Sequence, residues 1–376
     1  MRRRLAIVFF VLAAPLGTAA EERVTAGVHT FSDSEDNRVE TYALEWLQEL
    51  RHDWKVMLRG ALDRVVLPPL PGLPGSPENV DAITTASRPV QSVELSKQGY
   101  DKLREEATGN VEWTPASGRL RTNGSFYYSK ESDYVGRQIG VGLAHDFQQG
   151  NTNLSFGLSH GFDTITPEPH GGTTQPEEQR TTEDLTCVWT QMISPKSRGT
   201  VGFEGTWVMG FQSNPYRHVY AGGLVVPERH PDRRFRRSLF AQFDRYLMTR
   251  SSVSLGGRWY SDDWGVLAGT VDAQLHQYVG NHLIVRYRYR YHTQTAASFQ
   301  RDLYTSPEGV DGYYTADYKL DDFASNLFGV KLSVPFAGFQ IAPWARGVVL
   351  DLKVERYFDS KSFAATVLES GFTWPF

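Results

Sequence analysis

The sequence is poor in cysteine and has no long apolar run. Its single cysteine excludes an intramolecular disulfide framework and the C-x-x-C-H haem-attachment motif, so we expect no cofactor and would assign any redox centre to a partner. Cys187 alternates in phase with Leu185 and Trp189, and we interpret it as a small apolar residue rather than a nucleophile. No apolar run approaches the roughly eighteen residues of a transmembrane helix, so no membrane-spanning helix is predicted.

Positive charge is not in excess either. Lysine and arginine number 39, aspartate and glutamate number 43, and the formal net charge is -4. Proteins that bind nucleic acid neutralise phosphates with a surplus of cations, so this balance gives no reason to expect a nucleic-acid partner. The mean hydropathy of -0.40 would ordinarily indicate a soluble protein. The aromatic content of 13% is too high for a disordered tail.

The first twenty residues are typical of a secretory signal peptide. Three arginines at 2–4 precede an apolar run at 5–16 and small residues up to Ala20, after which we expect cleavage. The apolar run is too short to span a bilayer as a helix. The exported chain is then expected to be a single domain, residues 21–376. Loss of the three arginines lowers its formal net charge from -4 to -7.

Residues 282–294 show a pattern that recurs along the chain, in which three arginines alternate with three tyrosines. A single-stranded nucleic-acid groove would use both residue types on one surface, because rings stack on bases while guanidinium groups meet phosphates. Alternation by two instead places all the tyrosines on one face of a strand and all the arginines on the other. We therefore predict that Tyr287, Tyr289 and Tyr291 contact lipid and that the arginines face a polar lumen.

Segments with this period of two number about sixteen, and most have roughly the length of a tilted membrane strand. The connections alternate in length, with long loops expected at 67–100, 163–182, 213–233 and 296–321. A soluble β-sandwich would not segregate its long loops to one end, and it would leave sheet edges to protect. The predicted fold is all-β: an antiparallel transmembrane barrel of about sixteen strands with short periplasmic turns and longer extracellular loops.

The chain ends in Phe372, Trp374 and Phe376, which share one phase. This ending resembles that of bacterial outer-membrane β-barrel proteins, whose final phenylalanine is read by the barrel assembly machinery. The resemblance implies an outer-membrane location, contact with outer-membrane lipid, and recognition of these three residues as an assembly signal.

Charged residues occupy the phase opposite to the apolar one on the predicted strands. In a lumen too wide for side chains to fill, such charges need either water or each other. Their mixed signs leave two alternatives open: a watery pore that filters ions and small solutes, and a sheath whose charges pair around a plug or a partner protein. The candidate lumen-facing residues are Lys55, Arg59, Asp63, Arg104, Glu106, Glu112, Arg119, Arg121, Glu204, Arg258, Asp272, Arg286, Arg288, Arg290, Lys331, Asp351, Lys353, Glu355 and Glu369.

A more specific resemblance rests on five stretches: DAITTASRPV (81–90), SNPYRHVYAG (213–222), RWYSDDWGV (258–266), YTADYKLDDFAS (314–325) and VERYF (354–358). With these the chain resembles the domain-of-unknown-function 3570 family of bacterial outer-membrane β-barrel proteins. The family has no established activity. The resemblance implies that the gene lies beside those of exported redox or flavin-modified proteins, which suggests a role in electron transfer across the envelope.

Three charged clusters support weaker hypotheses. Asp262 and Asp263 could hold a divalent cation, but a tight hairpin with polar tip residues is favoured, and we expect no metal. Four arginines could bind anionic lipopolysaccharide or an acidic partner at the outer rim: Arg233, Arg234, Arg236 and Arg237. The alternative is that they simply form a charged rim. A third cluster has no defined ligand spacing and is interpreted as a solvated loop; it contains Glu168, His170, Glu177, Glu178, Glu183 and Asp184.

No catalytic constellation is recognisable. His29, His145, His160 and His276 lie on predicted strands, and none belongs to a nucleophile motif such as G-x-S-x-G. We therefore expect no enzymatic activity. The leading hypothesis is a porin-like pore or conduit for small solutes or ions. The alternative is a sheath or scaffold for a periplasmic or surface partner, including a redox-active or flavin-linked one.

Overall fold

The computed structural model describes residues 22–34, 37–50, 53–67, 100–115, 118–168, 175–280, 282–339 and 345–375. The expected signal peptide, the loop stretch 68–99 and Phe376 lie outside the described residues. No helix in the described part of the chain is long and apolar enough to cross a membrane.

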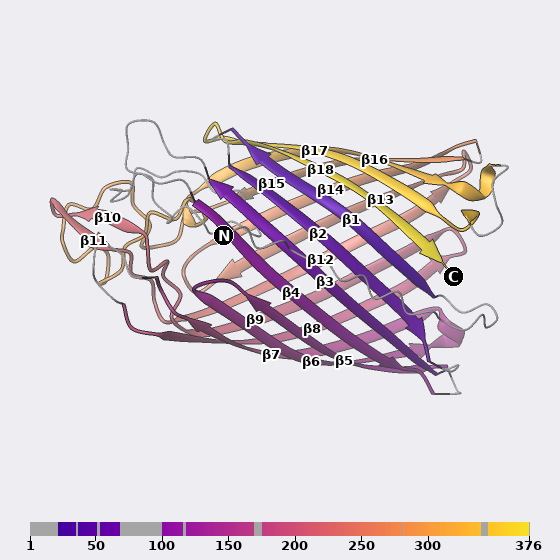
Figure 1. The fold of residues 1–376 in the computed structure, drawn as a ribbon, viewed down its shortest axis with the longest axis horizontal. Coiled ribbons are helices and arrows are strands. Elements are labelled where there is room, and N and C mark those ends of the chain that lie inside the picture. Colours follow the sequence, from indigo (N-terminus) through magenta and orange to yellow (C-terminus); the bar gives the residue numbers. More distant parts are fainter. Residues whose placement is uncertain are drawn as a thin grey trace, which may run out of the picture.

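Antiparallel strands form one closed barrel (Figure 1). Its strands are β1 (Arg23–Asp33), β2 (Arg38–Glu49), β3 (Trp54–Leu67), β4 (Tyr100–Trp113), β5 (Leu120–Lys130), β6 (Tyr134–Phe147), β7 (Thr152–Ile165), β8 (Glu178–Ser194), β9 (Ser197–Gly210), β12 (Arg233–Leu247), β13 (Ser251–Asp262), β14 (Leu267–Val279), β15 (Leu283–Gln294), β16 (Phe323–Pro335), β17 (Val349–Asp359) and β18 (Ala364–Pro375). These are sixteen strands, so the predicted fold class is confirmed.

The order of the strands around the barrel follows the sequence, and β1 closes it by pairing with β18. One interruption occurs where β10 (His218–Ala221) and β11 (Leu224–Pro227) form a separate hairpin, so that β9 pairs directly with β12. In the part of the chain that the structure describes, three single 3-10 turns also occur: η2 (Gln148–Gly150), η3 (Tyr318–Leu320) and η4 (Phe336–Gly338).

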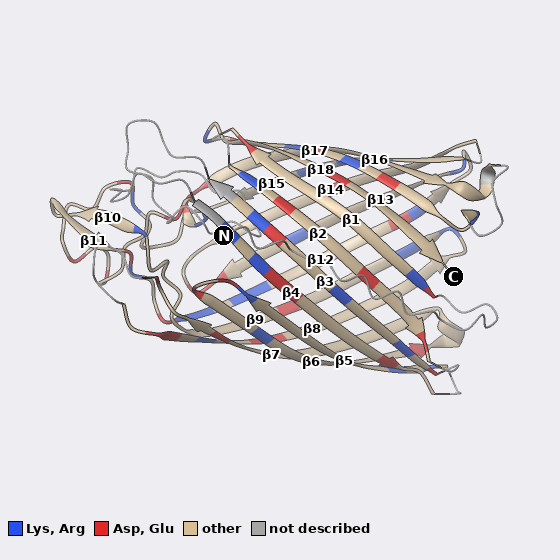
Figure 2. Cartoon of the chain, viewed as in Figure 1, with Lys and Arg blue, Asp and Glu red and all other residues tan. Residues whose placement is uncertain are grey.

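Register across the barrel wall separates apolar from charged rows. One row runs Leu275, Tyr287, Val330, Val354 and Leu368 across β14 to β18, and these side chains are between 36% and 52% exposed. The adjacent row, one residue along each strand, is His276, Arg286, Lys331, Lys353 and Glu369. The period of two therefore sorts the side chains into an outward apolar surface and an inward polar one. Figure 2 shows charges of both signs spread along the strands.

The connections differ in length between the two ends of the barrel. At one end, called the turn end below, the connections include residues 148–151, 195–196 and 248–250. At the other, the loop end, lie residues 211–232 with the β10–β11 hairpin and residues 295–322 (Figure 1). The predicted segregation of long loops to one end is thus observed.

The loop between β7 and β8 is shorter than predicted, spanning 166–177 rather than 163–182. Both strands continue beyond the expected limits because Asp163 and Arg180 lie opposite each other and form an ion pair of 2.8 Å between Oδ2 and Nη2. Glu183 and Asp184 consequently lie on β8 and not in the loop, while His170 lies outside the described residues.

The loop end has a small hydrophobic core of its own. Trp264 and Val266, at the β13–β14 hairpin, pack with Ala297, Phe299 and Leu320 of the 295–322 loop. These side chains are at most 4% exposed. Burial of this kind holds the long loop over the end of the barrel in one conformation.

Candidate functional site

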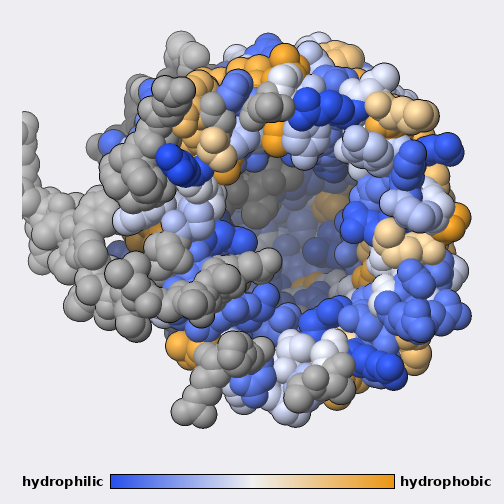
Figure 3. Space-filling view, turned by 90° about the vertical axis from the view of Figure 1, so that its right-hand side faces the viewer, coloured by the Kyte–Doolittle hydropathy of each residue, from blue (hydrophilic) through white to orange (hydrophobic). Residues whose placement is uncertain are grey.

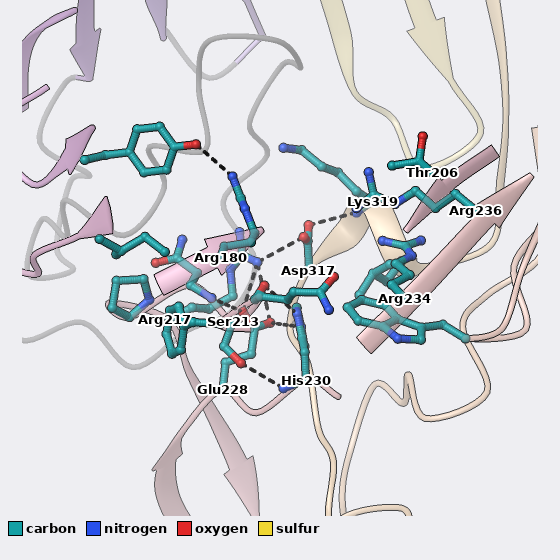
Figure 4. A pocket seen from close by; sticks show the side chains of 18 of the residues that line it. Arg180, Thr206, Ser213, Arg217, Glu228, His230, Arg234, Arg236, Asp317 and Lys319 are labelled. Carbon is teal, nitrogen blue, oxygen red and sulfur yellow. Dashed lines mark hydrogen bonds and ion pairs between the residues drawn. The ribbon is translucent and has the colours of Figure 1, made fainter. Parts of the chain in front are cut away.

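A cavity of about 800 Å³ lies at the loop end of the barrel (Figure 4). Its wall comes from inward side chains of β4, β6, β8, β9, β12 and β13, and its cover comes from residues 211–217, 228–230 and 317–320. The lining is predominantly charged and polar. The cavity is therefore suited to hydrated ions and polar solutes rather than to an apolar ligand.

The cover is held by a buried carboxylate, Glu228. Its side chain is fully buried and accepts a hydrogen bond from the Ala316 backbone N at 3.1 Å, while Arg217 Nη1 and His230 Nε2 lie 3.4 and 3.3 Å from its two oxygens. Thr315 Oγ1 also donates to it. Burial alone would raise the pKa of this carboxyl, but the charges of Arg217 and His230 outweigh it and lower the pKa below its usual range.

This carboxylate joins the two long loops. Arg217, Glu228 and His230 belong to the β9–β12 loop, whereas Thr315 belongs to the β15–β16 loop. Arg217 Nη1 also lies 3.3 Å from Asp317 Oδ2 of that second loop. A buried charge network satisfied on all sides rigidifies the segments that contribute to it.

Tyr216 ties the same cover to the opposite side of the barrel. Its hydroxyl donates to Asp133 Oδ2 at 2.6 Å, in the β5–β6 hairpin, and accepts from the Glu168 backbone N at 2.8 Å, in the β7–β8 loop. Burial raises the pKa of the Tyr216 phenol, and so does its hydrogen bond to Asp133, so the phenol remains a donor at neutral pH. The cover thus spans the opening from one wall to the other.

Several cations of the cavity wall have a carboxylate of their own. Lys102 Nζ lies 2.7 Å from Glu131 Oε2, and Arg258 Nη2 lies 2.7 Å from Glu204 Oε2. Arg234 Nε donates to Asp262 Oδ2 at 2.9 Å, and its guanidinium stands 4.2 Å from the Trp264 ring centroid. Arg180 pairs with Asp163 as described. These cations help to hold the wall together while contributing little net charge.

The arginine run at 233–237 does not form one patch, so the outer-rim hypothesis is wrong for Arg234 and Arg236. Both line the cavity, because β12 places them in the same inward phase as Ser238. Ser238 lies opposite Glu204 of β9, which lines the cavity as well. Arg237 belongs to the other phase, where its Nε donates to Ser261 Oγ at 2.8 Å, although it too borders the cavity. Strand alternation thus points Arg234 and Arg236 inward, while Arg233, in the opposite phase, does not line the cavity.

Most predicted lumen-facing residues lie on the barrel wall away from this cavity, and only Arg104, Glu204 and Arg258 line it. On β14 to β18 they form a continuous network. Asp272 Oδ2 accepts from both Arg288 Nε and Arg290 Nε at 3.0 Å, and Glu355 Oε1 lies 3.1 Å from Arg288 Nη1 and 3.7 Å from Arg286 Nη2. Lys353 joins this network through Glu355, 4.0 Å away, and pairs with Glu369, while Lys331 and Asp351 form a neighbouring ion pair.

On β2 to β6 the predicted residues form separate pairs. Lys55 Nζ lies 3.1 Å from Glu49 Oε1, Arg121 Nη1 lies 2.9 Å from Asp146 Oδ2, and Arg104 pairs with Glu106. The rest are placed by register alone: Asp63 opposite Arg104, Arg59 opposite Thr108, Glu112 opposite Lys55, and Arg119 in the turn before β5.

The Asp262–Asp263 motif is a hairpin, as favoured from the sequence. Asp262 Oδ1 accepts from the Val266 backbone N at 2.9 Å, and Asp263 Oδ1 accepts from the Phe235 backbone N at 3.0 Å. Among the residues that the structure describes, no group of three His, Cys, Asp or Glu side chains is placed to hold a metal ion.

Sequence reasoning missed the residues that cover the cavity: Arg217, Glu228, His230, Asp317 and Lys319. They lie in loops, where no period predicts which side chains turn inward. The sequence did mark two of these segments, because residues 213–222 and 314–325 were among the stretches that carried the family resemblance.

Comparison with known proteins gives a family match. The model of the family described as "Protein of unknown function (DUF3570)" matches residues 78–366. No curated protein matches the sequence.

Solved structures resemble the chain only distantly. One is the siderophore receptor PirA from Pseudomonas aeruginosa, with 11% identity and a TM-score of 0.43 over 90% of this chain and 56% of that one. The chain therefore spans little more than half of that receptor. OpdK from Pseudomonas aeruginosa, solved with vanillate, has 11% identity and a TM-score of 0.44 over 94% and 98% of the two chains. The CymD monoaromatic hydrocarbon channel has 9% identity and a TM-score of 0.43 over 95% and 88%. Likenesses this weak identify no solute and no partner.

Proposed function

The chain belongs to the DUF3570 family of proteins of unknown function, and from its own geometry we propose that it is an outer-membrane pore for ions and small polar solutes. One observation carries the proposal. The closed barrel is hollow and lined by hydrophilic residues when viewed from the turn end, and at the loop end it contains a charged cavity of about 800 Å³ (Figure 3). A lumen of this kind holds water, which ions and polar solutes need to pass.

The outward surface supports a membrane location. Five apolar side chains that point outward from the strands are between 49% and 64% exposed: Leu58, Val141, Tyr287, Phe328 and Leu368. Apolar side chains at this density on the outside of a closed barrel are stable against lipid and unfavourable in water. Together with the signal peptide and the assembly signal at Phe372, Trp374 and Phe376 that the sequence leads us to expect, this surface favours the outer membrane, with the loop end facing outward.

The wall favours a pore over a sheath. A sheath would offer uncompensated charges to its partner, whereas Asp272, Glu355, Arg288 and Lys353 already pair with one another or with their neighbours on the wall. A partner that displaced these pairs would have to replace them at a desolvation cost. Water solvates such pairs without displacing them.

Planar-bilayer recording tests the proposal. The mature full-length chain, folded in detergent and added to one chamber, should give discrete conductance steps in potassium chloride. Absence of steps at any voltage, together with stoichiometric co-purification of a second protein from native membranes, would overturn the pore in favour of the sheath. A conducting barrel that purifies without a partner supports it.

A further inference from the structure

We infer that Arg236 is the anion-binding residue of the cavity, taking the carboxylate or phosphate oxygens of a small solute on its way through the barrel. The inference rests on the proposed pore and adds to it a class of preferred solute. It is carried by one juxtaposition: an arginine without an ion pair projects into a polar cavity where the neighbouring carboxylates are already engaged.

Arg236 is placed in the cavity by β12. It lies opposite Thr206 of β9 and Asp262 of β13, in the inward phase. Arg234, two residues earlier on the same strand, lines the same cavity, as does Lys319 from the cover. Figure 4 shows Arg234 and Arg236 projecting from their strand into the cavity near Lys319. A solute entering here meets several positive groups on one side.

Asp262, the closest carboxylate by register, is occupied. Its Oδ2 accepts from Arg234 Nε at 2.9 Å and from the Tyr260 hydroxyl at 2.8 Å, and its Oδ1 accepts from the Val266 backbone N at 2.9 Å. Turning toward Arg236 would break the bonds that hold the β13–β14 hairpin and Arg234. Asp262 therefore forms its ion pair with Arg234, and its charge acts on Arg236 only from beyond ion-pair distance.

The two other carboxylates near this row are engaged as well. Asp184 of β8 accepts from Gln138 Nε2 at 3.0 Å, Ser159 Oγ at 2.9 Å and Thr206 Oγ1 at 2.7 Å. Glu204 of β9 accepts from Arg258 Nη2 at 2.7 Å and from Ser238 Oγ at 3.0 Å. Neither forms an ion pair with Arg236.

The Arg236 side chain accordingly has no ion pair and no hydrogen bond with any residue that the structure describes, and its Nε is buried without an acceptor. A buried donor without a partner is unfavourable, and a buried charge more so. An anionic oxygen from a solute would satisfy both the donor and the charge. The same desolvated setting strengthens the attraction, because the local dielectric is lower than in bulk water.

The chemistry of the guanidinium selects the ligand. Its planar fork of N–H donors matches two oxygens of a carboxylate or a phosphate, and it binds them bidentately. A cavity of about 800 Å³ is large enough for an organic anion of modest size with part of its hydration. Inorganic phosphate and succinate represent the two forms of this ligand.

The test combines a current with an equilibrium measurement on the full-length barrel. Reversal potentials in a potassium chloride gradient are recorded for the wild type, Arg236→Gln and Arg236→Lys, and the affinities for phosphate and for succinate are measured by calorimetry in detergent. Arg245→Gln is the matched control, since Arg245 lies on the same strand in the opposite phase, toward the turn end. Loss of one charge-assisted bidentate contact should weaken anion binding about tenfold in Arg236→Gln.

Each outcome bears on the inference. Arg236→Gln should shift the reversal potential toward cation preference and weaken the binding of one or both probes, and the probe affected more identifies the preferred oxygen donor. Arg236→Lys should retain the ion preference but bind less tightly than arginine, because a point charge replaces the fork. Arg245→Gln should change neither. Unchanged selectivity and affinity in Arg236→Gln overturns the inference while leaving the pore intact. Anion binding by a barrel that does not conduct supports the site and overturns the pore. If Arg236→Gln fails to fold, equal anion affinity in the wild type and Arg236→Lys counts against the inference.

Discussion

The two faces of β15 should respond oppositely to a change of charge, and Tyr287 and Arg288 give the sharpest contrast. Tyr287 is 51% exposed and lies in the outward row with Val330 and Val354. Replacing it with arginine places a cation against hydrocarbon near the middle of the strand. The expected loss in the free energy of unfolding is about 2–4 kcal/mol.

Replacing Arg288 with glutamine should cost much less. Arg288 bridges Asp272 and Glu355, but Asp272 keeps Arg290 at 3.0 Å and Glu355 keeps Arg286 at 3.7 Å. Neither carboxylate is left without a cation, and water in the lumen solvates what remains. We expect a loss of about 1 kcal/mol or less.

Equilibrium unfolding in urea of the barrel folded into lipid vesicles, followed by tryptophan fluorescence, measures both changes. The two variants differ by one position on one strand, so differences in turn formation or insertion yield cancel between them. If Tyr287→Arg were as stable as the wild type while Arg288→Gln failed to fold, the assignment of the inward and outward faces would be inverted.

Three further predictions concern the loop end and the C-terminus. The pKa of Glu228 is lower in the folded protein than its ordinary value of 4.5. The charged carboxylate should therefore stabilise the loop fully above pH 4.5, and this stabilisation should be lost as the pH falls through the lower folded pKa. Over that pH range, the difference in hydrogen exchange of residues 211–232 between the wild type and Glu228→Gln should shrink. Equal differences at neutral and at strongly acidic pH would contradict this. Gly222→Ala should loosen the β10–β11 hairpin, because the φ of Gly222 is +58° and a Cβ would lie 2.6 Å from Pro307 Cδ. Gly223 has a φ of +79°, but a Cβ added there meets no neighbour within 4 Å. In limited proteolysis, Gly223→Ala should therefore be cleaved less than Gly222→Ala. Comparable cleavage of the two would argue against that contact. Deletion of Phe376 should lower the amount of barrel in the outer membrane, as measured by membrane fractionation. Bilayer recording should show an unchanged conductance for the molecules that insert. Full assembly of the truncated chain would contradict a role of Phe376 in the assembly signal.

The period of two is enough to predict the barrel, because alternation is imposed by strand geometry and by the contrast between lipid and lumen. It places Tyr287 and Arg288 on opposite faces of one strand from the residue pattern alone. The same rule applied to β12 separates Arg234 and Arg236 from Arg233 and Arg237, since Ser238 and Leu239 establish the phase of that strand. The outer-rim hypothesis failed for Arg234 and Arg236 because it grouped the four arginines by type and not by phase.

The cover of the cavity could not be predicted in this way. Tyr216 reaches Asp133, 83 residues away, and Glu228 reaches Thr315, 87 residues away. Contacts between loops leave no period in the sequence, and their geometry depends on how the closed barrel positions the strand ends. Phase could identify the residues of the wall, but only the folded loops show which of them line the cavity.

The central claim, that the lumen conducts, is tested most directly by blocking it from within. In a Cys187→Ser background, a single cysteine is introduced at Thr206, which lines the cavity, or at Val201, which points outward from the same strand and is 47% exposed. A bulky charged thiol reagent is then added during bilayer recording. We predict that it reduces the conductance of the Thr206→Cys barrel in discrete single steps and leaves the Val201→Cys barrel unchanged. Equal currents before and after modification of Thr206→Cys, with labelling verified by mass, would contradict a conducting path through the barrel.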